Sequence, residues 1–151
     1  KHIIELDKKY KTVEEFHHFL LSSDSKSTVK KYKEVIENEF YPKRGEPKMR
    51  LSVARNAIGE AKKLGLDALS LADLMLFYVE TGVRFTNDYG DIDEAFYNSM
   101  ESMYLKALKF MHKERMLELY RTRAESILNN TRDIGWGFHD TLGDYFYEFY
   151  D

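Results

Sequence analysis

One histidine stands directly before a carboxylate near the end of the chain, in the stretch IGWGFHDTLGD. This pair is His139 and Asp140. A histidine near carboxylates can act as a general base or bind a metal ion, because its pKa lies close to neutrality. Further groups come from the segment ETGVRFTNDYGDIDE, where Glu80 and Arg84 are four residues apart. We therefore consider a catalytic site of these four residues, which requires His139 to meet a predicted loop over residues 82–93 in a cleft.

The same predicted loop is rich in oxygen ligands. Asp88, Asp91 and Asp93 could together bind Ca²⁺ or Mg²⁺, although their spacing does not match a calcium-binding EF-hand loop. A structural interpretation competes with this one. Asp91 or Asp93 would cap the next helix, and Arg84 would pair with Glu80 one turn earlier or with the loop acids. The spacing leaves both interpretations open.

Five cations gather around a predicted loop and the start of the helix that follows it, within FYPKRGEPKMRLSVAR. Cations beside a helix start can bind a phosphate or carboxylate, and a neighbouring tyrosine, Tyr41, could stack on a base. The alternative is a solvated basic loop that docks on the acidic half of the chain. The residues of this segment, which covers residues 43–55, are Lys43, Arg44, Lys48, Arg50 and Arg55.

The closing stretch RDIGWGFHDTLGDYFYEFYD separates into two helix faces. Carboxylates follow an i, i+4, i+8 row at Asp140, Asp144 and Glu148, while aromatic and aliphatic side chains follow the opposite face. We predict that the row is exposed and the apolar face buried. The glycines on either side of Trp136 predict bends that let its ring enter the core, and His139 could fix this turn by a hydrogen bond.

Apolar residues along the chain recur mostly at spacings of three and four, which is typical of helices. Caps and breakers set the expected ends: Pro42 ends one helix, Gly65 ends another, Ser70 begins a third and Asp93 begins a fourth. We expect a loop between residues 22 and 27. The predicted helices cover approximately residues 1–10, 12–20, 29–40, 47–64, 70–81, 93–111, 117–127 and 138–149.

These elements predict one all-α domain over residues 1–151, with seven or eight helices. Short loops favour antiparallel neighbours, either as an irregular bundle or as a short right-handed helical array. The helix over 70–81 is apolar almost all round, so it and the helix over 93–111 should form the centre. Because the first residues already show helical spacing, we expect the natural chain to continue before Lys1.

Composition narrows the classes of function. The 151 residues include no cysteine, so neither a disulfide nor a thiolate nucleophile is available, which fits a reducing cytoplasm. No apolar run is long enough to span a membrane. The net charge is −3, but residues 1–63 carry +5 and residues 64–151 carry −8. This asymmetry marks either a partner surface or two halves that attract each other, and the acidic total disfavours non-specific binding to duplex DNA.

Two passages carry a resemblance to a known family. LADLMLFYVETGVRFTNDYGDIDEAFYNSMESM and IGWGFHDTLGDYFYEFY resemble a bacterial family of all-helical proteins, domain of unknown function 6155. FYPKRGEPK resembles its middle section. The resemblance implies an all-α intracellular protein and implies no activity.

Three functional hypotheses follow. We favour a non-enzymatic, cytoplasmic helical scaffold or partner-binding module that binds protein, either itself or another chain, and needs no cofactor. The second is an enzyme, metal-dependent or based on His139 and Asp140, with its site against residues 82–93. The third is an anion-binding or nucleic-acid-binding protein that uses residues 43–55.

Overall fold

The computed structural model describes residues 23–151, so the helices predicted over 1–10 and 12–20 lie outside the described residues. The described part is all helical and contains no strand. Its helices are α3 (Ser23–Phe40), α4 (Leu51–Lys63), α5 (Ala68–Tyr89), α6 (Glu94–Lys113), α7 (Arg121–Asn129) and α8 (Phe138–Phe149).

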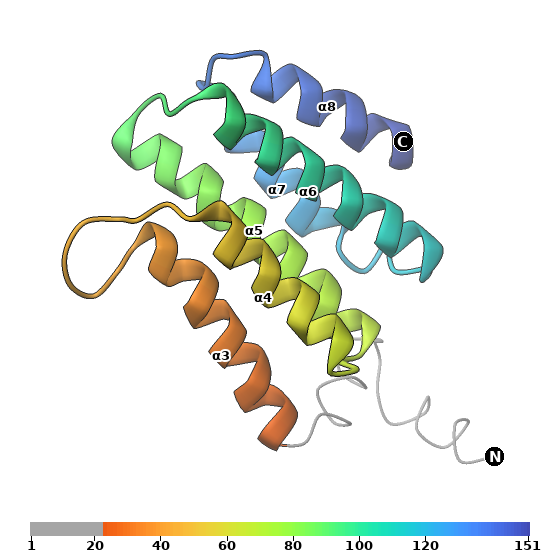
Figure 1. Cartoon of the computed structure of the whole chain (residues 1–151). Helices are drawn as coiled ribbons and strands as arrows, with labels where there is room; N and C mark the ends of the chain where they lie inside the picture. Colours follow the sequence, from red (N-terminus) through yellow and green to blue (C-terminus); the bar gives the residue numbers. More distant parts are fainter. Residues whose placement is uncertain (1–22) are drawn as a thin grey trace.

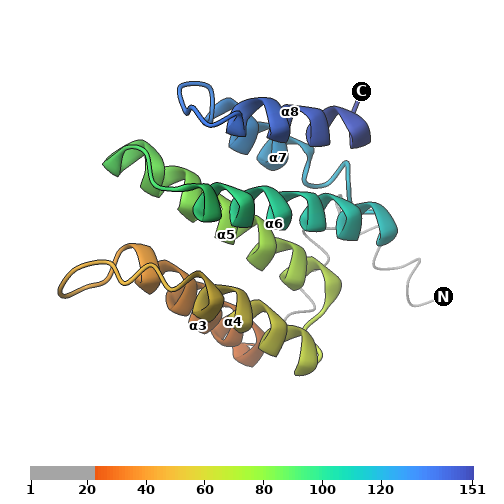
Figure 2. The same ribbon diagram turned by 45° about the horizontal axis from the view of Figure 1, so that its top comes forward.

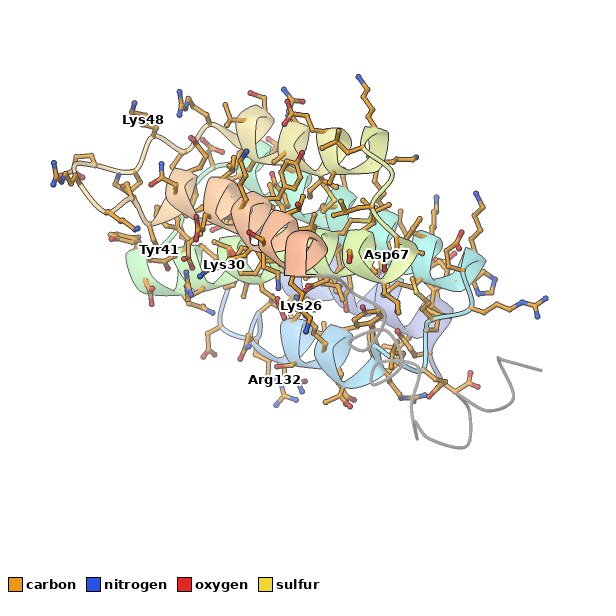
Figure 3. All side chains as sticks on the ribbon, turned by 90° about the horizontal axis from the view of Figure 1, so that it is seen from below. Lys26, Lys30, Tyr41, Lys48, Asp67 and Arg132 are labelled. Carbon is orange, nitrogen blue, oxygen red and sulfur yellow. The ribbon has the colours of Figure 1, made fainter. Side chains whose placement is uncertain are left out.

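The six described helices form three antiparallel pairs stacked in tiers: α3 with α4, α5 with α6, and α7 with α8 (Figures 1 and 2). The α5–α6 pair lies in the middle, as the sequence predicts. α5 also contacts α3 and α7, while α6 contacts α8. Consequently α3, α5 and α7 share one side of the molecule, onto which Figure 3 looks.

The three loops that join the partners of each pair all lie at one edge of the molecule (Figures 1 and 2). They cover residues 41–50, 90–93 and 130–137. We call this the hairpin edge. The connections between successive pairs lie at the opposite edge.

Local capping signals predict some boundaries correctly. Asp93 caps α6, because its carboxylate accepts a hydrogen bond from the Phe96 amide at 2.8 Å. Gly65 follows the end of α4 with a φ of +85°, in the left-handed region that glycine adopts freely. The predicted span of α8 is correct at both ends.

Other predicted boundaries are wrong. Residues 23–27 are helical rather than part of a loop, α4 begins at Leu51 rather than near Pro47, and α7 begins at Arg121. The cap of α5 is Asp67, not Ser70: the Asp67 carboxylate accepts hydrogen bonds from both the amide and the hydroxyl of Ser70.

The largest correction concerns the loop predicted over residues 82–93. α5 continues through Gly82 to Tyr89, and only residues 90–93 form the connection. Gly82 is a contact point between helices: a Cβ atom there would clash with Sδ of Met100 on α6. A glycine can occur because the chain turns there or because another helix approaches closely. At Gly82 the reason is the close approach of α6.

The core is aromatic and continuous across the three tiers. Phe40 packs edge-on against Tyr78, Phe85 and Phe96, which joins α3, α5 and α6. On α8 the apolar face is buried and the row Asp140, Asp144, Glu148 is exposed, as predicted. No helix among residues 23–151 has the length and apolar character needed to cross a bilayer.

Trp136 contradicts the prediction. Its side chain is 54% exposed, although its ring stacks on Tyr97 with centroids 5.6 Å apart. Both Trp136 and Gly137 have positive φ values, 66° and 69°. The flanking glycines therefore accompany a left-handed bend that turns the indole outward, and they do not bring it into the core.

Candidate functional site

A groove of about 430 Å³ lies between α5 and α7. We call it the α5–α7 groove. Its apolar lining comes from Phe77, Val83 and Ile127, and its polar lining includes Glu80, Arg84 and Asp88. On α5 these positions recur at three and four residues, so they share one face of the helix. Three predicted site residues are thus brought together by the helical continuation that the sequence did not predict.

Glu80 pairs with Arg123 of α7. The sequence predicts that Arg84 pairs with Glu80 or with the loop acids, and both alternatives are wrong, because Arg84 pairs with Glu37. The Arg123 guanidinium donates two hydrogen bonds to the Glu80 carboxylate, at 2.9 and 2.8 Å, and one to Asp73 at 2.7 Å. Lys33 of α3 approaches the other oxygen of Asp73 at 2.9 Å. This network of four charged residues ties α3, α5 and α7 together.

Arg84 lies at the other end of the groove and binds to α3. It donates to Glu37 at 2.8 Å, and its guanidinium stands 4.2 Å from the ring centroid of Tyr41. The Tyr41 hydroxyl in turn donates to Asp88 at 2.6 Å. Burial, followed by the hydrogen bond to Asp88, raises the pKa of Tyr41 to about 12. Tyr41 therefore stays protonated at neutral pH and holds the end of α3 over the end of α5 (Figure 3).

His139 does not line the groove. Its Nδ1 lies 2.7 Å from the hydroxyl of buried Thr131, and that hydroxyl donates to the carbonyl of Leu128 at 2.7 Å. Because a hydroxyl has only one hydrogen, Nδ1 must be the donor to Thr131. His139 thus anchors the start of α8 to the end of α7, while Asp140 is exposed on the first turn of α8.

The three aspartates of the predicted metal site have three different roles. Asp88 accepts from Tyr41, Asp93 caps α6, and Asp91 is exposed in the connection. Across residues 23–151 there is no group of three or more histidine, aspartate or glutamate side chains close enough to hold a metal ion. The metal-dependent form of the enzyme hypothesis therefore has no assembled ligand set in the described part of the chain.

The basic segment 43–55 divides into two groups. Arg50 donates to both oxygens of the buried Glu39 carboxylate, at 2.9 and 2.8 Å, and Arg55 donates to Ser99 at 2.9 Å. The other cations, Lys43, Arg44 and Lys48, are exposed. With Arg50 they border a pocket of about 320 Å³. Arg50 is thus already bound to an internal carboxylate.

The Glu39–Arg50 pair should make the protein sensitive to acid. The hydrogen bonds from Arg50 outweigh burial and hold the pKa of Glu39 below its ordinary value of 4.5. A carboxyl with a lowered folded pKa contributes stability above its unfolded pKa, and that contribution is lost as the pH falls through the folded pKa. Glu39→Gln should therefore lower the free energy of unfolding by about 1–2 kcal/mol at neutral pH, and by progressively less at acidic pH, as the pH falls below 4.5 toward the lowered folded pKa.

Urea unfolding of both proteins at neutral and at acidic pH measures this difference. Glu34→Gln, on the exposed face of the same helix, is the matched control and should behave like the parent at both. A loss that stays constant between neutral and acidic pH would contradict the assignment of Glu39 as a paired carboxylate.

Comparison with known proteins gives one match. The model of DUF6155, a family of unknown function, matches residues 1–149. The chain belongs to this family. Among curated proteins and among solved structures nothing matches the chain. This membership confirms the resemblance found in the sequence. It assigns no activity to the chain, because the function of the family is unknown.

Sequence reasoning about this DUF6155 chain missed Arg123, which binds the groove residue Glu80, and it named Tyr41 only as a ring that could stack on a base, not as the partner of the groove residue Asp88. The partners of both lie on other helices, more than 40 positions away in the sequence, so no local pattern connects them. One signal was available: Asp73 and Glu80 are seven residues apart on a helix that is otherwise apolar, and two carboxylates on such a face require a cation from a neighbouring helix.

Proposed function

We propose that this DUF6155 protein is a helical partner-binding module whose α5–α7 groove receives a short segment of another protein. The observation that carries the proposal is the groove itself, where half-buried Phe77 offers apolar surface, above the almost buried Val83 and Ile127, between charged groups that are already paired. An apolar side chain of the partner would cover this surface, since burial of apolar area drives most protein association.

The pairing of the charges supports binding over proton transfer. Glu80 is held by Arg123, Arg84 by Glu37 and Asp88 by Tyr41. Charged groups fixed in this way form a rigid polar rim that sets the orientation of a partner without paying to rearrange. We also place the module in the cytoplasm, for which the absence of cysteine is the support.

The experiment blocks the groove without touching the core. Ser126 is exposed and lines the groove, so Ser126→Tyr should fill part of it. Glu125 is also exposed but does not line it, so Glu125→Tyr is the matched control. Peptides selected on the parent protein from a random phage-displayed library are then synthesised, and their affinity for each variant is measured by fluorescence anisotropy.

We expect Ser126→Tyr to weaken the selected peptides by at least about tenfold, because an interface anchor typically carries more than 1.4 kcal/mol. Glu125→Tyr should leave their affinity within about twofold of the parent. If both variants bind alike, or if the library gives no binder, the groove is not the binding surface.

A further inference from the structure

Charge is sorted along the hairpin edge. At the α3–α4 end, the loop 41–50 exposes three cations besides Arg50, which is paired with Glu39, and one exposed carboxylate, Glu46, offsets them. At the other end, the connections before α6 and α8, together with the first turn of each of these helices, expose five carboxylates, offset by one exposed cation, Arg132. The cations are Lys43, Arg44 and Lys48, and the carboxylates are Asp91, Asp93, Glu94, Asp133 and Asp140. We call these the basic end and the acidic end; Lys48 marks the first in Figure 3.

An exposed indole stands at the acidic end. Trp136 keeps a backbone φ of 66°, which is unfavourable for a bulky residue, and it remains 54% exposed. Its ring rests on Tyr97, whose hydroxyl is fixed by Thr86 at 2.8 Å and by the amide of Ile92 at 3.2 Å. The indole is therefore held outward on a rigid support. Tryptophan offers the best aromatic face for a lysine or arginine cation.

We propose that a second copy of this chain covers the hairpin edge, with the two edges antiparallel about a two-fold axis. The basic end of each protomer then faces the acidic end and Trp136 of the other. Under a two-fold axis the contact between a basic end and an acidic end occurs twice, once for each protomer. The assembly then closes as a dimer instead of growing into a filament. The reason for choosing a second copy is that both complementary surfaces are present on one edge of the same molecule.

This inference goes beyond the proposed function, because the α5–α7 groove lies on the side of the molecule and the dimer would use the edge. The two can fail separately. The groove test measures binding of a peptide, whereas the edge test measures the mass of the particle.

Charge reversal gives a test that a general loss of stability cannot imitate. One variant carries Lys43→Glu and Arg44→Glu, so both of its ends are negative. The second carries Asp91→Lys, Asp133→Lys and Asp140→Lys, so the three lysines and Arg132 outnumber the two remaining carboxylates and its acidic end becomes positive, while its basic end is unchanged. Each variant alone should be a monomer, with the dimer dissociation constant raised on the order of a hundredfold, since like charges facing each other at an interface cost several kcal/mol. Mixed together, the two should form a heterodimer, because every facing pair of ends is then opposite in sign.

Sedimentation velocity over a dilution series, at low and at high salt, measures these states. The parent should pass from dimer to monomer on dilution and more readily at high salt. The emission of Trp136, the only tryptophan in the chain, should shift to shorter wavelength as the dimer forms. The control Lys62→Glu and Lys63→Glu makes the same charge change at the opposite end of α4, and it should dimerise like the parent.

The proposal is overturned if the parent is a monomer throughout the dilution series, if either charge-reversed variant dimerises alone, or if their mixture stays monomeric while each remains fully helical by circular dichroism. A control variant that is also monomeric would equally overturn it, since net charge and not the hairpin edge would then set the association.

Discussion

Replacing Arg123 by alanine should lower the free energy of unfolding by about 3 kcal/mol, because it leaves two carboxylates facing each other without their shared cation. Asp73 and Glu80 lie on the same face of α5, and Arg123 donates to both. Burial alone would lower the pKa of Arg123, but the hydrogen bonds and charge of Glu80 and the charge of Asp73 raise it. Its charge is therefore present at every pH at which the protein is folded.

Urea unfolding followed by circular dichroism measures this loss. Arg132→Ala is the matched control: Arg132 is exposed just beyond α7 and donates a single hydrogen bond, to Asn129 at 3.2 Å. Its removal should cost less than about 0.5 kcal/mol, as for most surface substitutions. Arg123→Lys should fall between the two, because an ammonium keeps the charge but cannot make the paired hydrogen bonds of a guanidinium. Equal losses for Arg123→Ala and Arg132→Ala would show that the network does not hold α7 in place.

The same network shows why more of the fold than of the candidate site could be predicted from the sequence. The spacing of apolar residues at three and four positions predicts which face of each helix is buried. This prediction does not require knowing which helix packs against that face. On α8 that reasoning placed the buried face and the exposed carboxylate row correctly. Asp73 and Glu80 receive their cation from another helix, and the stacking of the tiers determines which one. No local sequence pattern predicts that stacking.

Some of the predicted site residues were grouped correctly by their spacing on one helix, and others depend on tertiary packing. Glu80, Arg84 and Asp88 do line one groove, because spacings of four on one helix bring them to one face. His139 does not join them, since its position depends on where α8 packs after the left-handed bend. Trp136 was wrongly predicted to be buried: flanking glycines report the backbone conformation that a turn needs, and they do not report on which side of the turn the ring lies.

Gly82→Ala should lower the free energy of unfolding by about 2 kcal/mol, through overpacking against Met100. Two effects compete at this position. Alanine is a better helix former than glycine by about 1 kcal/mol, which favours the substitution. The added Cβ would clash with the Met100 sulfur, however, and because Met100 is fully buried, the end of its side chain would have to move within the packed interior. We expect the steric cost to exceed the gain in helix propensity.

A matched glycine and a double-mutant cycle test this account. Gly59 is exposed within α4, and a Cβ there would meet nothing within 4 Å, so Gly59→Ala should stabilise the protein by about 0.5–1 kcal/mol. Met100→Ala alone should cost about 3 kcal/mol, chiefly through the cavity that it leaves. In the double variant the alanine at position 82 fills part of that cavity, and the combined cost should fall below the sum of the single costs by about 1 kcal/mol or more. Additive costs, or a Gly82→Ala protein as stable as Gly59→Ala, would mean that Met100 can move aside, and that the close packing of α5 on α6 does not depend on this glycine.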